Sequence, residues 1–492
     1  MRESEMKKVL EVGVLLSSER DLNRLLERIL DCVMELAHCD AGTLYLLDGD
    51  ALRFKIMRNN TLRTCSGGNG QDPDLPPVPL RRENVCALAM LENRTIRIAD
   101  VRSDSSCDFS GPIRYDAITG YLTQSMLVVP MHSREGERIG VLQLINALDG
   151  EGAVCEFPED MALVLESVAS QASITIQNVR YIREIRALFH SFVQVMSAAI
   201  DERSPYNANH SRRMAEYGGR FVDFLNARAE AGSQPPPFSD QHKEELLMSI
   251  LLHDIGKLTT PLEVMDKAQR LSPLQKAAVS HRLETIRLQA RIDCLEGRIS
   301  PVDRDALTAE TRDAEQKINS IGAAGFLSDE QLSWLAATRR RTYTDETGQD
   351  HPWLTEEEYA MLSIRKGTLS DEERKIMENH VVITDKLLSQ IRFSADLSHV
   401  RQWASAHHEL LNGSGYPNRL AGEDIPMEVR ILTILDIFDA LVADDRPYKP
   451  GMPVERALSI LESMANREGK LDPNLTAQFI ASRCWEDNLE EK

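Results

Sequence analysis

The first third of the chain consists of short apolar segments separated by glycine, proline and aspartate. Segments 42–48, 125–131 and 140–147 (GTLYLLD, SMLVVPM and GVLQLINA) each have the length of a strand. Their pattern predicts an antiparallel sheet rather than a series of βαβ units. Residues 21–37, DLNRLLERILDCVMELA, predict an amphipathic helix before the first strand. The glycine- and proline-rich stretch 65–79 predicts a loop without regular structure.

A long segment without glycine or proline follows, from about Glu159 to Ile200, and predicts one continuous helix. Seven of its residues fall near a heptad seam, but three of them are polar, so the seam is marginal as an isolated coiled coil. We interpret the segment as a signalling helix in a parallel homodimer, with a passive linker as the alternative. The seam consists of Leu163, Ser167, Ser170, Ile174, Asn178, Ile182 and Ile185.

The composition indicates how many domains, which binding partners and which cellular compartment to expect. With 492 residues the chain can form two or three domains that each have a core. A formal net charge of −20 argues against a nucleic-acid polymer or an anionic membrane as the partner. The eight cysteines form no CxxC pair, and no signal peptide or long apolar span is present. We therefore expect a reducing, cytoplasmic location.

The stretch HHELLNGSGYP carries the strongest chemical signal in the sequence. His407 and His408 are adjacent and precede a glycine-rich turn at 412–417. Imidazole is the commonest metal ligand in proteins, and a rigid turn can direct two neighbouring rings at one cluster. We expect Glu409 to orient one of these histidines from behind. The pattern predicts a metal centre in the second half of the chain.

Residues elsewhere in this half can complete such a centre. The segment LLHDIGK places His253 beside Asp254, whose carboxylate can bridge two metal ions, and Lys257 follows one turn later. Three further residues lie in segments with helical patterns, NANHSRRM, MENHVVITDKLL and ILTILDIFDAL; they are His210, His380 and Asp436.

The number and type of these residues predict two metal ions. Taken singly, a helical histidine is usually solvated or hydrogen-bonded rather than a ligand. Asp436 is a stronger indication, because a carboxylate within an apolar run is costly to bury unless a cation meets it. Five histidines and two aspartates are too many for one ion. Their mixed nitrogen and oxygen donors favour Fe or Mn over a thiolate zinc site.

The motifs H, HD, H and HH, followed by GSGYP, D and DRPYK, resemble in their order the HD-GYP subgroup of HD-superfamily phosphohydrolases over about residues 190–485. The resemblance implies an all-α, metal-dependent domain. The ligands that it implies are His210, His253, Asp254, His380, His407, His408 and Asp436. It implies catalytic roles for Asp254 and Lys257, and substrate contacts for Lys257, Gly415, Tyr416, Arg446 and Lys449.

The best-known activity of this family is hydrolysis of cyclic di-GMP to linear pGpG, and further cleavage to GMP stays open. The resemblance implies that two ions supply a bridging water of lowered pKa as the nucleophile. Lys257 would then stabilise the phosphate or assist the leaving oxygen, and Tyr416 would pack beside a guanine. Two alternatives stay open: a cyclic di-GMP receptor with slow turnover, and a phosphohydrolase of another nucleotide such as a cyclic GMP-AMP dinucleotide.

Three features depart from the family pattern. Tyr206 stands where some members have a glutamate that holds a third metal, so we expect two metals. Asn412 stands where the motif usually has aspartate, which removes no ligand. His253 and His380 are 127 positions apart (380 − 253), far more than in the family, which indicates an insertion at about 268–365.

The insertion is rich in helix formers and charge. Apolar residues recur at helical spacing on both sides of Pro301. We interpret the segment as a helical hairpin, and as a solvated structural arm in preference to a substrate lid. The recurring residues are Val279, Leu283, Ile286, Ala290, Ala314, Ile318 and Ile321.

The N-terminal third resembles a GAF domain over about residues 17–180, in the segments CDFSGPIRYDAITGYLTQSMLVVP and IGVLQLINA. GAF domains act as small-ligand sensors or as dimerisation modules. The signature of cyclic-nucleotide-binding GAF domains is only partly present, around Asn146 and Phe157. His38 and His132 are more simply surface histidines than haem ligands. We therefore assign no GAF ligand.

Together these patterns predict an α+β multidomain protein. The expected parts are a GAF domain with an antiparallel sheet flanked by helices, a connecting helix at 159–200, and a C-terminal all-α HD-GYP domain with a helical insertion.

Overall fold

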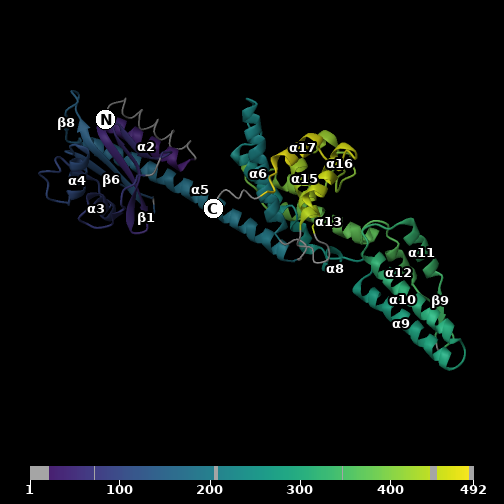
Figure 1. Ribbon diagram of the computed structural model, residues 1–492. Coiled ribbons are helices and arrows are strands. Elements are labelled where there is room, and N and C mark those ends of the chain that lie inside the picture. Colours follow the sequence, from purple (N-terminus) through teal and green to yellow (C-terminus); the bar gives the residue numbers. More distant parts are fainter. Residues whose placement is uncertain are drawn as a thin grey trace. The chain divides into compact units, whose positions relative to one another are not determined.

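The computed structural model describes residues 21–70, 73–133, 135–203, 209–345, 347–443 and 451–486. The chain forms two compact units, Met1–Phe189 and His190–Lys492 (Figure 1). Helix α5 (Glu159–Arg203) begins in the first unit and ends in the second. Among the described helices, none has the length and apolar character needed to cross a membrane.

The first unit is built on one antiparallel sheet, as predicted. Its strands run in the order β3-β2-β1-β7-β6-β5, with β4 paired to β2 and β8 paired to β7. All of these strand pairs are antiparallel. The strands are β1 (Cys39–Asp48), β2 (Ala51–Asn59), β3 (Thr64–Gly67), β4 (Val78–Pro79), β5 (Ile96–Ile98), β6 (Met126–His132), β7 (Arg138–Leu148) and β8 (Val154–Cys155).

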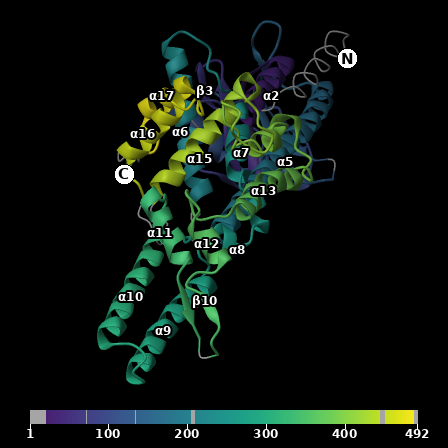
Figure 2. The same ribbon diagram turned by 90° about the vertical axis from the view of Figure 1, so that its right-hand side faces the viewer.

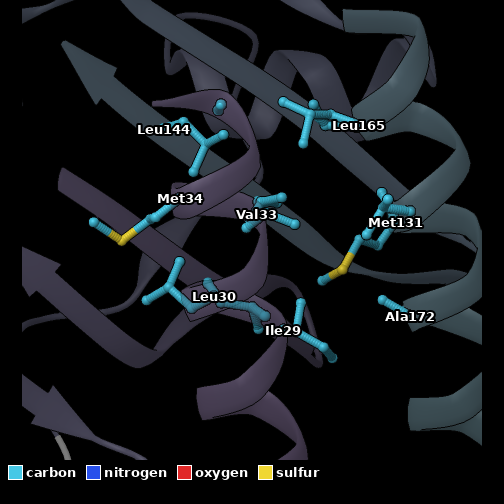
Figure 3. Packing of buried hydrophobic residues seen from close by; sticks show 14 of the residues in the cluster. Ile29, Leu30, Val33, Met34, Met131, Leu144, Leu165 and Ala172 are labelled. Atoms are coloured by element: carbon cyan, nitrogen blue, oxygen red, sulfur yellow. The ribbon is translucent and has the colours of Figure 1, made fainter. Parts of the chain in front are cut away.

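Helices cover both faces of this sheet. Alternation along β1 sends Leu44 and Leu46 into one core and Tyr45 into the other. The predicted helix α2 (Leu22–Ala37) packs with α5 on the first face, and α3 (Val85–Glu92) packs on the second; α4 (Ser110–Thr119) follows β5. Figure 3 shows the first core, where α2, β6, β7 and α5 meet through Ile29, Leu30, Val33, Met34, Met131, Leu144, Leu165 and Ala172.

The stretch 65–79 is not wholly irregular, contrary to the prediction. Its first residues belong to β3, and its end forms β4. Both short strands pair with β2 at the edge of the sheet, so backbone pairing rather than side-chain pattern gives them their structure. Residues 71 and 72 lie outside the described part of the chain.

Helix α5 is continuous over 45 residues, which confirms the helix predicted at 159–200. Its first part contributes Leu165, Ala172 and Ile176 to the core of the first unit. Near its other end Val193 and Ile200 are buried in the second unit. Between and beside these residues a row of large apolar side chains is exposed: Leu163, Ile174, Tyr181, Ile182, Ile185, Leu188, Phe192 and Val195.

The second unit has a helical core, as predicted. Its main cluster joins α6, α7, α15, α16 and α17 through residues such as Phe221, Phe438 and Phe479. Its elements outside the insertion are α6 (His210–Ala231), α7 (Asp240–Leu252), η1 (Ile255–Thr259), α8 (Leu262–Met265), α13 (Asp371–Leu388), η2 (Ala395–Leu397), α14 (Val400–Ala404), η3 (Gly422–Asp424), α15 (Met427–Val442), α16 (Val454–Asn466) and α17 (Pro473–Ser482).

The insertion contains the predicted hairpin and more. Helices α9 (Pro273–Leu295) and α10 (Pro301–Ala323) lie side by side in Figures 1 and 2, and the seven apolar residues predicted for them are buried. The insertion also contains elements that the sequence pattern did not predict: α11 (Asp329–Arg339), the strand pair β9 (Thr342–Thr344) and β10 (Asp350–Pro352), and α12 (Glu356–Leu362). These parts share a core of their own, with Leu335, Trp353 and Leu362. The insertion is therefore a small α+β subdomain.

The two ends of the insertion meet at the start of α13. Lys267 Nζ donates to both carboxylate oxygens of Glu373, each at 2.7 Å. Thr368 Oγ1 donates to the backbone carbonyl of Lys267 at 2.8 Å. Next to this point the buried guanidinium of Arg270 donates to the carbonyl oxygens of Ile321, Ala324 and Ile364. The subdomain is thus attached to the helix that carries His380.

Candidate metal centre

Five segments of the second unit bring the predicted ligands together. His210 is the first residue of α6, His253 and Asp254 occupy the junction between α7 and η1, and His380 lies within α13. The pair His407–His408 follows α14, and Asp436 lies in the middle of α15. Figure 2 shows α6, α7, α13 and α15 grouped in this unit.

Asp254 lies between two groups of histidines. Its Oδ2 is 3.2 Å from Nε2 of His253 and 3.9 Å from Nε2 of His210. Its Oδ1 is 3.4 Å from Nε2 of His380 and 3.9 Å from Nε2 of His407. Each oxygen of one carboxylate therefore faces a different pair of imidazoles, which is the arrangement that a carboxylate bridging two metal ions requires.

Asp436 reaches the same two groups from α15. Its Oδ1 is 3.3 Å from Nε2 of His210, and its Oδ2 is 3.6 Å from Nδ1 of His408. Two sets of donor atoms each lie within 4.8 Å of one another and could each hold a metal ion: His210, His253 and Asp254 in one, and His380, His407 and His408 in the other.

The ligand atoms fit metal ions because two of them are buried without a hydrogen-bond partner in the described part of the chain. His253 and His407 are fully buried, and Asp254 is 2% exposed. Among the described residues, Nε2 of His253 and Oδ1 of Asp254 have no hydrogen-bond partner. A buried polar atom without a partner costs about 1–3 kcal/mol, and a metal ion would satisfy these atoms together.

Three of the histidine rings are held with Nε2 toward the cluster. In His253, His380 and His407, Nδ1 lies 2.6, 2.6 and 2.8 Å from the carbonyl oxygen three residues earlier. Donation from Nδ1 to that carbonyl leaves a lone pair on Nε2, the atom that faces the neighbouring ligands. Local helical and turn geometry thus presents each ring.

The pKa values of His380, His407 and His408 favour neutral imidazoles, which can act as metal ligands. Burial lowers the pKa of His380, lowers that of His407 strongly, and lowers that of His408 to about 4. Burial opposes a charge on Asp254, but His253 and Lys257 hold its pKa well below the usual range. A charged carboxylate beside neutral imidazoles is a set of donors suited to a divalent cation.

His210 differs from the other histidines. Burial lowers its pKa, but hydrogen bonds with Asp436 and Asp439 outweigh burial and raise the pKa to about 9. Without a metal, a proton on this ring balances the neighbouring carboxylates. Binding of a metal at Nε2 would replace that proton.

Asp439 is a further residue at the candidate site that was not predicted from the sequence. It is fully buried, and its Oδ2 lies 2.7 Å from Nδ1 of His210. The guanidinium of Arg213 donates to both of its oxygens, at 2.8 and 2.9 Å. A second carboxylate three residues after Asp436, in the same apolar run, was the available signal.

Close backbone packing also fixes the HD turn, the segment from His253 to Thr260 that includes η1. Thr384 Oγ1 donates to the carbonyl of His253 at 2.9 Å and accepts from the N–H of Gly256 at 3.0 Å. A Cβ atom on Gly256 would overlap the carbonyl oxygen of His380. The glycine therefore allows η1 to lie directly against α13.

The role predicted for Glu409 is wrong. We expected it to orient a histidine, but its buried carboxylate instead accepts from the backbone N–H groups of Asn418 and Leu420, at 2.7 and 2.9 Å. It therefore stabilises the chain after the glycine-rich turn. A carboxylate next to a ligand histidine can point toward either partner, and sequence alone does not distinguish them.

The glycine-rich turn places Tyr416 beside the histidines. The ring centroids of Tyr416 and His408 are 4.8 Å apart. A Cβ atom on Gly415 would overlap the backbone at His408 and Leu410, so this glycine serves the turn itself. Asn412 Oδ1 accepts from the Ser414 N–H at 3.0 Å, and its Nδ2 donates to the Glu468 carbonyl at 3.1 Å.

Of the remaining residues singled out in the sequence, the structure describes Lys257. Lys257 Nζ donates to Asp254 Oδ2 at 2.6 Å, which places it at the centre. Tyr206, Arg446 and Lys449 lie outside the described residues.

The GAF residues have structural partners. The Asn146 side chain is buried and donates to the Tyr121 hydroxyl and the Leu122 carbonyl, and Phe157 is fully buried in the first core. His38 is exposed at the end of α2, in the left-handed region with a φ of 47°.

Comparison with protein families matches residues 21–176 to the GAF domain and residues 357–475 to the HD domain. The chain therefore carries a GAF domain followed by an HD domain, as the resemblance predicted.

Parts of this chain are similar to three curated relatives. The 3'3'-cGAMP-specific phosphodiesterase 3 of Vibrio cholerae is 36% identical over 23% of this chain and 23% of its own length. The cyclic di-GMP phosphodiesterase response regulator RpfG of Xanthomonas campestris is 28% identical over 46% of this chain and 60% of its own. The cyclic di-GMP phosphodiesterase of Thermotoga maritima is 32% identical over 31% and 42%, respectively. The matches therefore span less than two thirds of each relative.

Proposed function

We propose that the second unit is a metal-dependent phosphodiesterase that hydrolyses cyclic di-GMP to pGpG, with further cleavage to GMP left open. The observation that carries this proposal is the position of Asp254, with one oxygen toward His253 and His210 and the other toward His380 and His407. The names of the three relatives support the substrate class, since each name mentions a cyclic dinucleotide.

The proposed ligands are His210, His253, Asp254, His380, His407, His408 and Asp436, with two divalent ions, Fe or Mn. Such ions lower the pKa of water and neutralise charge that develops on a phosphodiester. The chain itself holds the rings and carboxylates in place and excludes bulk solvent from most of them.

Lys257 and Tyr416 are the proposed substrate residues among those described. Lys257 pairs with Asp254 here, so its ammonium lies where a phosphate next to the metals would accept a hydrogen bond. Tyr416 lies beside His408 and offers an aromatic face to a guanine. Arg446 and Lys449 stay predictions from the motif.

The deciding experiment compares Asp254→Asn with Asp424→Asn, a matched change on the exposed element η3. Mn- or Fe-loaded wild-type protein is incubated with cyclic di-GMP and the products are separated by chromatography. We expect pGpG from wild type and from Asp424→Asn. Asp254→Asn should lose at least about a hundredfold in rate, because loss of even an outer partner of a ligand costs about 10–100-fold. Wild-type activity in Asp254→Asn would refute the assigned site.

A second candidate substrate is a cyclic GMP-AMP dinucleotide. It is favoured by the 36% identity to a phosphodiesterase named for 3'3'-cGAMP. Including this dinucleotide in the same assay distinguishes the two substrates by their kcat/KM. Tight binding of cyclic di-GMP without any product would instead favour the receptor alternative.

We further propose that the GAF domain senses a small ligand and that the chain forms a parallel homodimer through α5. The support is the exposed apolar row on α5, which includes Ile185, Leu188, Phe192 and Val195. Light scattering tests this proposal: Leu188→Glu should convert a dimer of wild-type chains to monomers, and Arg180→Glu on the same helix serves as a charge control.

A further inference from the structure

The last turn of α5 is bonded directly to the backbone of the HD turn. Arg203 Nη1 donates to the carbonyl oxygen of Lys257 at 2.8 Å, and Nη2 donates to that of Thr260 at 2.9 Å. Lys257 lies within η1, and its carbonyl oxygen also accepts from the backbone N–H of Thr260, the residue that caps η1, at 3.1 Å. The planar guanidinium matches two acceptors at once and so fixes the orientation of the turn.

A second contact joins the same helical turn to the start of α6. Ser211 Oγ donates to Oδ1 of Asp201 at 3.3 Å, and both side chains are buried. Ser211 directly follows the proposed ligand His210. The end of α5 therefore contacts two of the segments that supply the metal centre.

Helix α5 is able to carry a displacement to these contacts. It has no break between Glu159 and Arg203. Residues such as Ala172 and Ile176 are part of the first core, whereas Val193, Ser197 and Ile200 are buried in the second unit. A rotation or axial shift of this helix in the first unit would thus move the Arg203 guanidinium.

The residue held by Arg203 is the one that contacts Asp254. The carbonyl oxygen of Lys257 accepts a hydrogen bond from Arg203. The Nζ of Lys257 donates to Asp254 Oδ2 at 2.6 Å. A change at the carbonyl therefore alters the position from which the ammonium reaches the metal centre.

We propose that Arg203 is a positioning residue through which α5 sets the place of Lys257 relative to Asp254, and so transmits the state of the GAF domain to the catalytic centre. This inference rests on the proposed function, since it gives Lys257 a role in turnover. Arg203 touches neither the ligands nor the substrate and acts through the backbone of η1.

The test compares Arg203→Gln, the conservative Arg203→Lys, and a control, Glu202→Gln, on the adjacent exposed residue. Two readouts are taken on the full metal-loaded chain: kcat for cyclic di-GMP, and amide hydrogen exchange of the segment 254–260. Loss of hydrogen bonds from a charged donor should speed exchange in this segment about tenfold or more. Misplacement of Lys257 should lower kcat by about 10–100-fold with KM and metal content unchanged. Arg203→Lys should restore part of both, and Glu202→Gln should change neither.

Each outcome decides the proposal. Faster exchange together with a lower kcat supports it, whereas unchanged exchange, or faster exchange with wild-type kcat, overturns it. A fall in melting temperature or metal content that matches the fall in kcat would assign Arg203 to stability alone and also overturn it. If the wild type has no activity on cyclic dinucleotides, the proposed function fails, and the exchange experiment still decides whether Arg203 holds the turn.

Discussion

The buried polar side chains around Tyr121 in the first unit have hydrogen-bond partners, whereas atoms at the candidate metal centre of the second unit lack them within the part of the chain that the structure describes. In the GAF domain the Tyr121 hydroxyl donates to buried Asp40 at 2.7 Å and accepts from Asn146 at 3.0 Å. In the second unit Nε2 of His253 and Oδ1 of Asp254 lack hydrogen-bond partners among the described residues. Burial alone therefore does not mark a functional site. Unsatisfied polar atoms of neighbouring side chains, placed at one cluster of potential metal ligands, do mark a candidate site.

The largest expected effect concerns pH and metal affinity. Burial opposes the proton on His210, yet Asp436 and Asp439 raise its pKa to about 9. Because a metal must displace that proton, Mn affinity should rise about tenfold per pH unit between pH 6.5 and 8.5, or about a hundredfold in total. Calorimetry in buffers of different ionisation enthalpy measures both the affinity and the proton released. An affinity independent of pH, with no proton released, would place the metal elsewhere.

The raised pKa of His210 has the opposite consequence for the stability of the metal-free protein, which should fall as the pH rises. The folded pKa of His210 lies above its ordinary value of 6.5, so its stabilising contribution is complete below that pH and is lost as the pH rises through about 9. Metal-free protein should therefore become less resistant to urea over this window as metal binding becomes stronger.

Removing an outer partner tests how the ligands are supported. Asp439→Asn keeps the size of the side chain but weakens its bonds to His210 and Arg213. We expect metal affinity to fall about 10–100-fold, measured by competition with a chelator. Glu462→Gln, an exposed carboxylate on α16, is the control. Equal affinities in both variants would show that Asp439 does not support the centre.

The paired network of the GAF domain should respond in stability alone. Tyr121→Phe leaves the Asp40 carboxylate and the Asn146 amide each short of one partner. The free energy of unfolding of the first unit should fall by about 1–3 kcal/mol in urea titrations. The metal content should not change, and a loss of metal would remove the contrast between the two networks.

The smallest effect is expected at the glycine-rich turn. Asn412→Asp retains the acceptor for the Ser414 N–H but loses the donor to the Glu468 carbonyl. The free energy of unfolding should fall by about 0.5–1.5 kcal/mol, as measured by urea denaturation. A stability equal to or above wild type would mean that the donated bond contributes nothing.

Much of the fold followed from local pattern. Helix α2 and the helices α9 and α10 have a helical apolar period that faces one core each, and the apolar side chains of β1, β6 and β7 alternate between the two cores of the first unit. The strands β3 and β4 and the pair β9–β10 were missed, because they depend on pairing with a neighbouring strand rather than on an apolar period of their own.

The candidate site could be predicted where its residues form patterns that are unusual in a sequence. Adjacent histidines and an acid in an apolar run are visible signals, and the structure places all seven predicted ligands within one region. Asp439, Thr384 and Arg203 were missed because their roles depend on contacts between distant segments. Glu409 was assigned to the wrong partner for the same reason.

The shared attachment point of the insertion makes that subdomain separable from the metal centre. Lys267 and Thr368 are neighbours in space although about a hundred residues of chain run between them, and the Lys267–Glu373 pair fixes the start of α13 at this crossing. Chain leaves and re-enters the HD fold at a single place, so its length there can change without altering the path of the helix that holds His380. A short bridge in place of residues 269–366 would close the same junction.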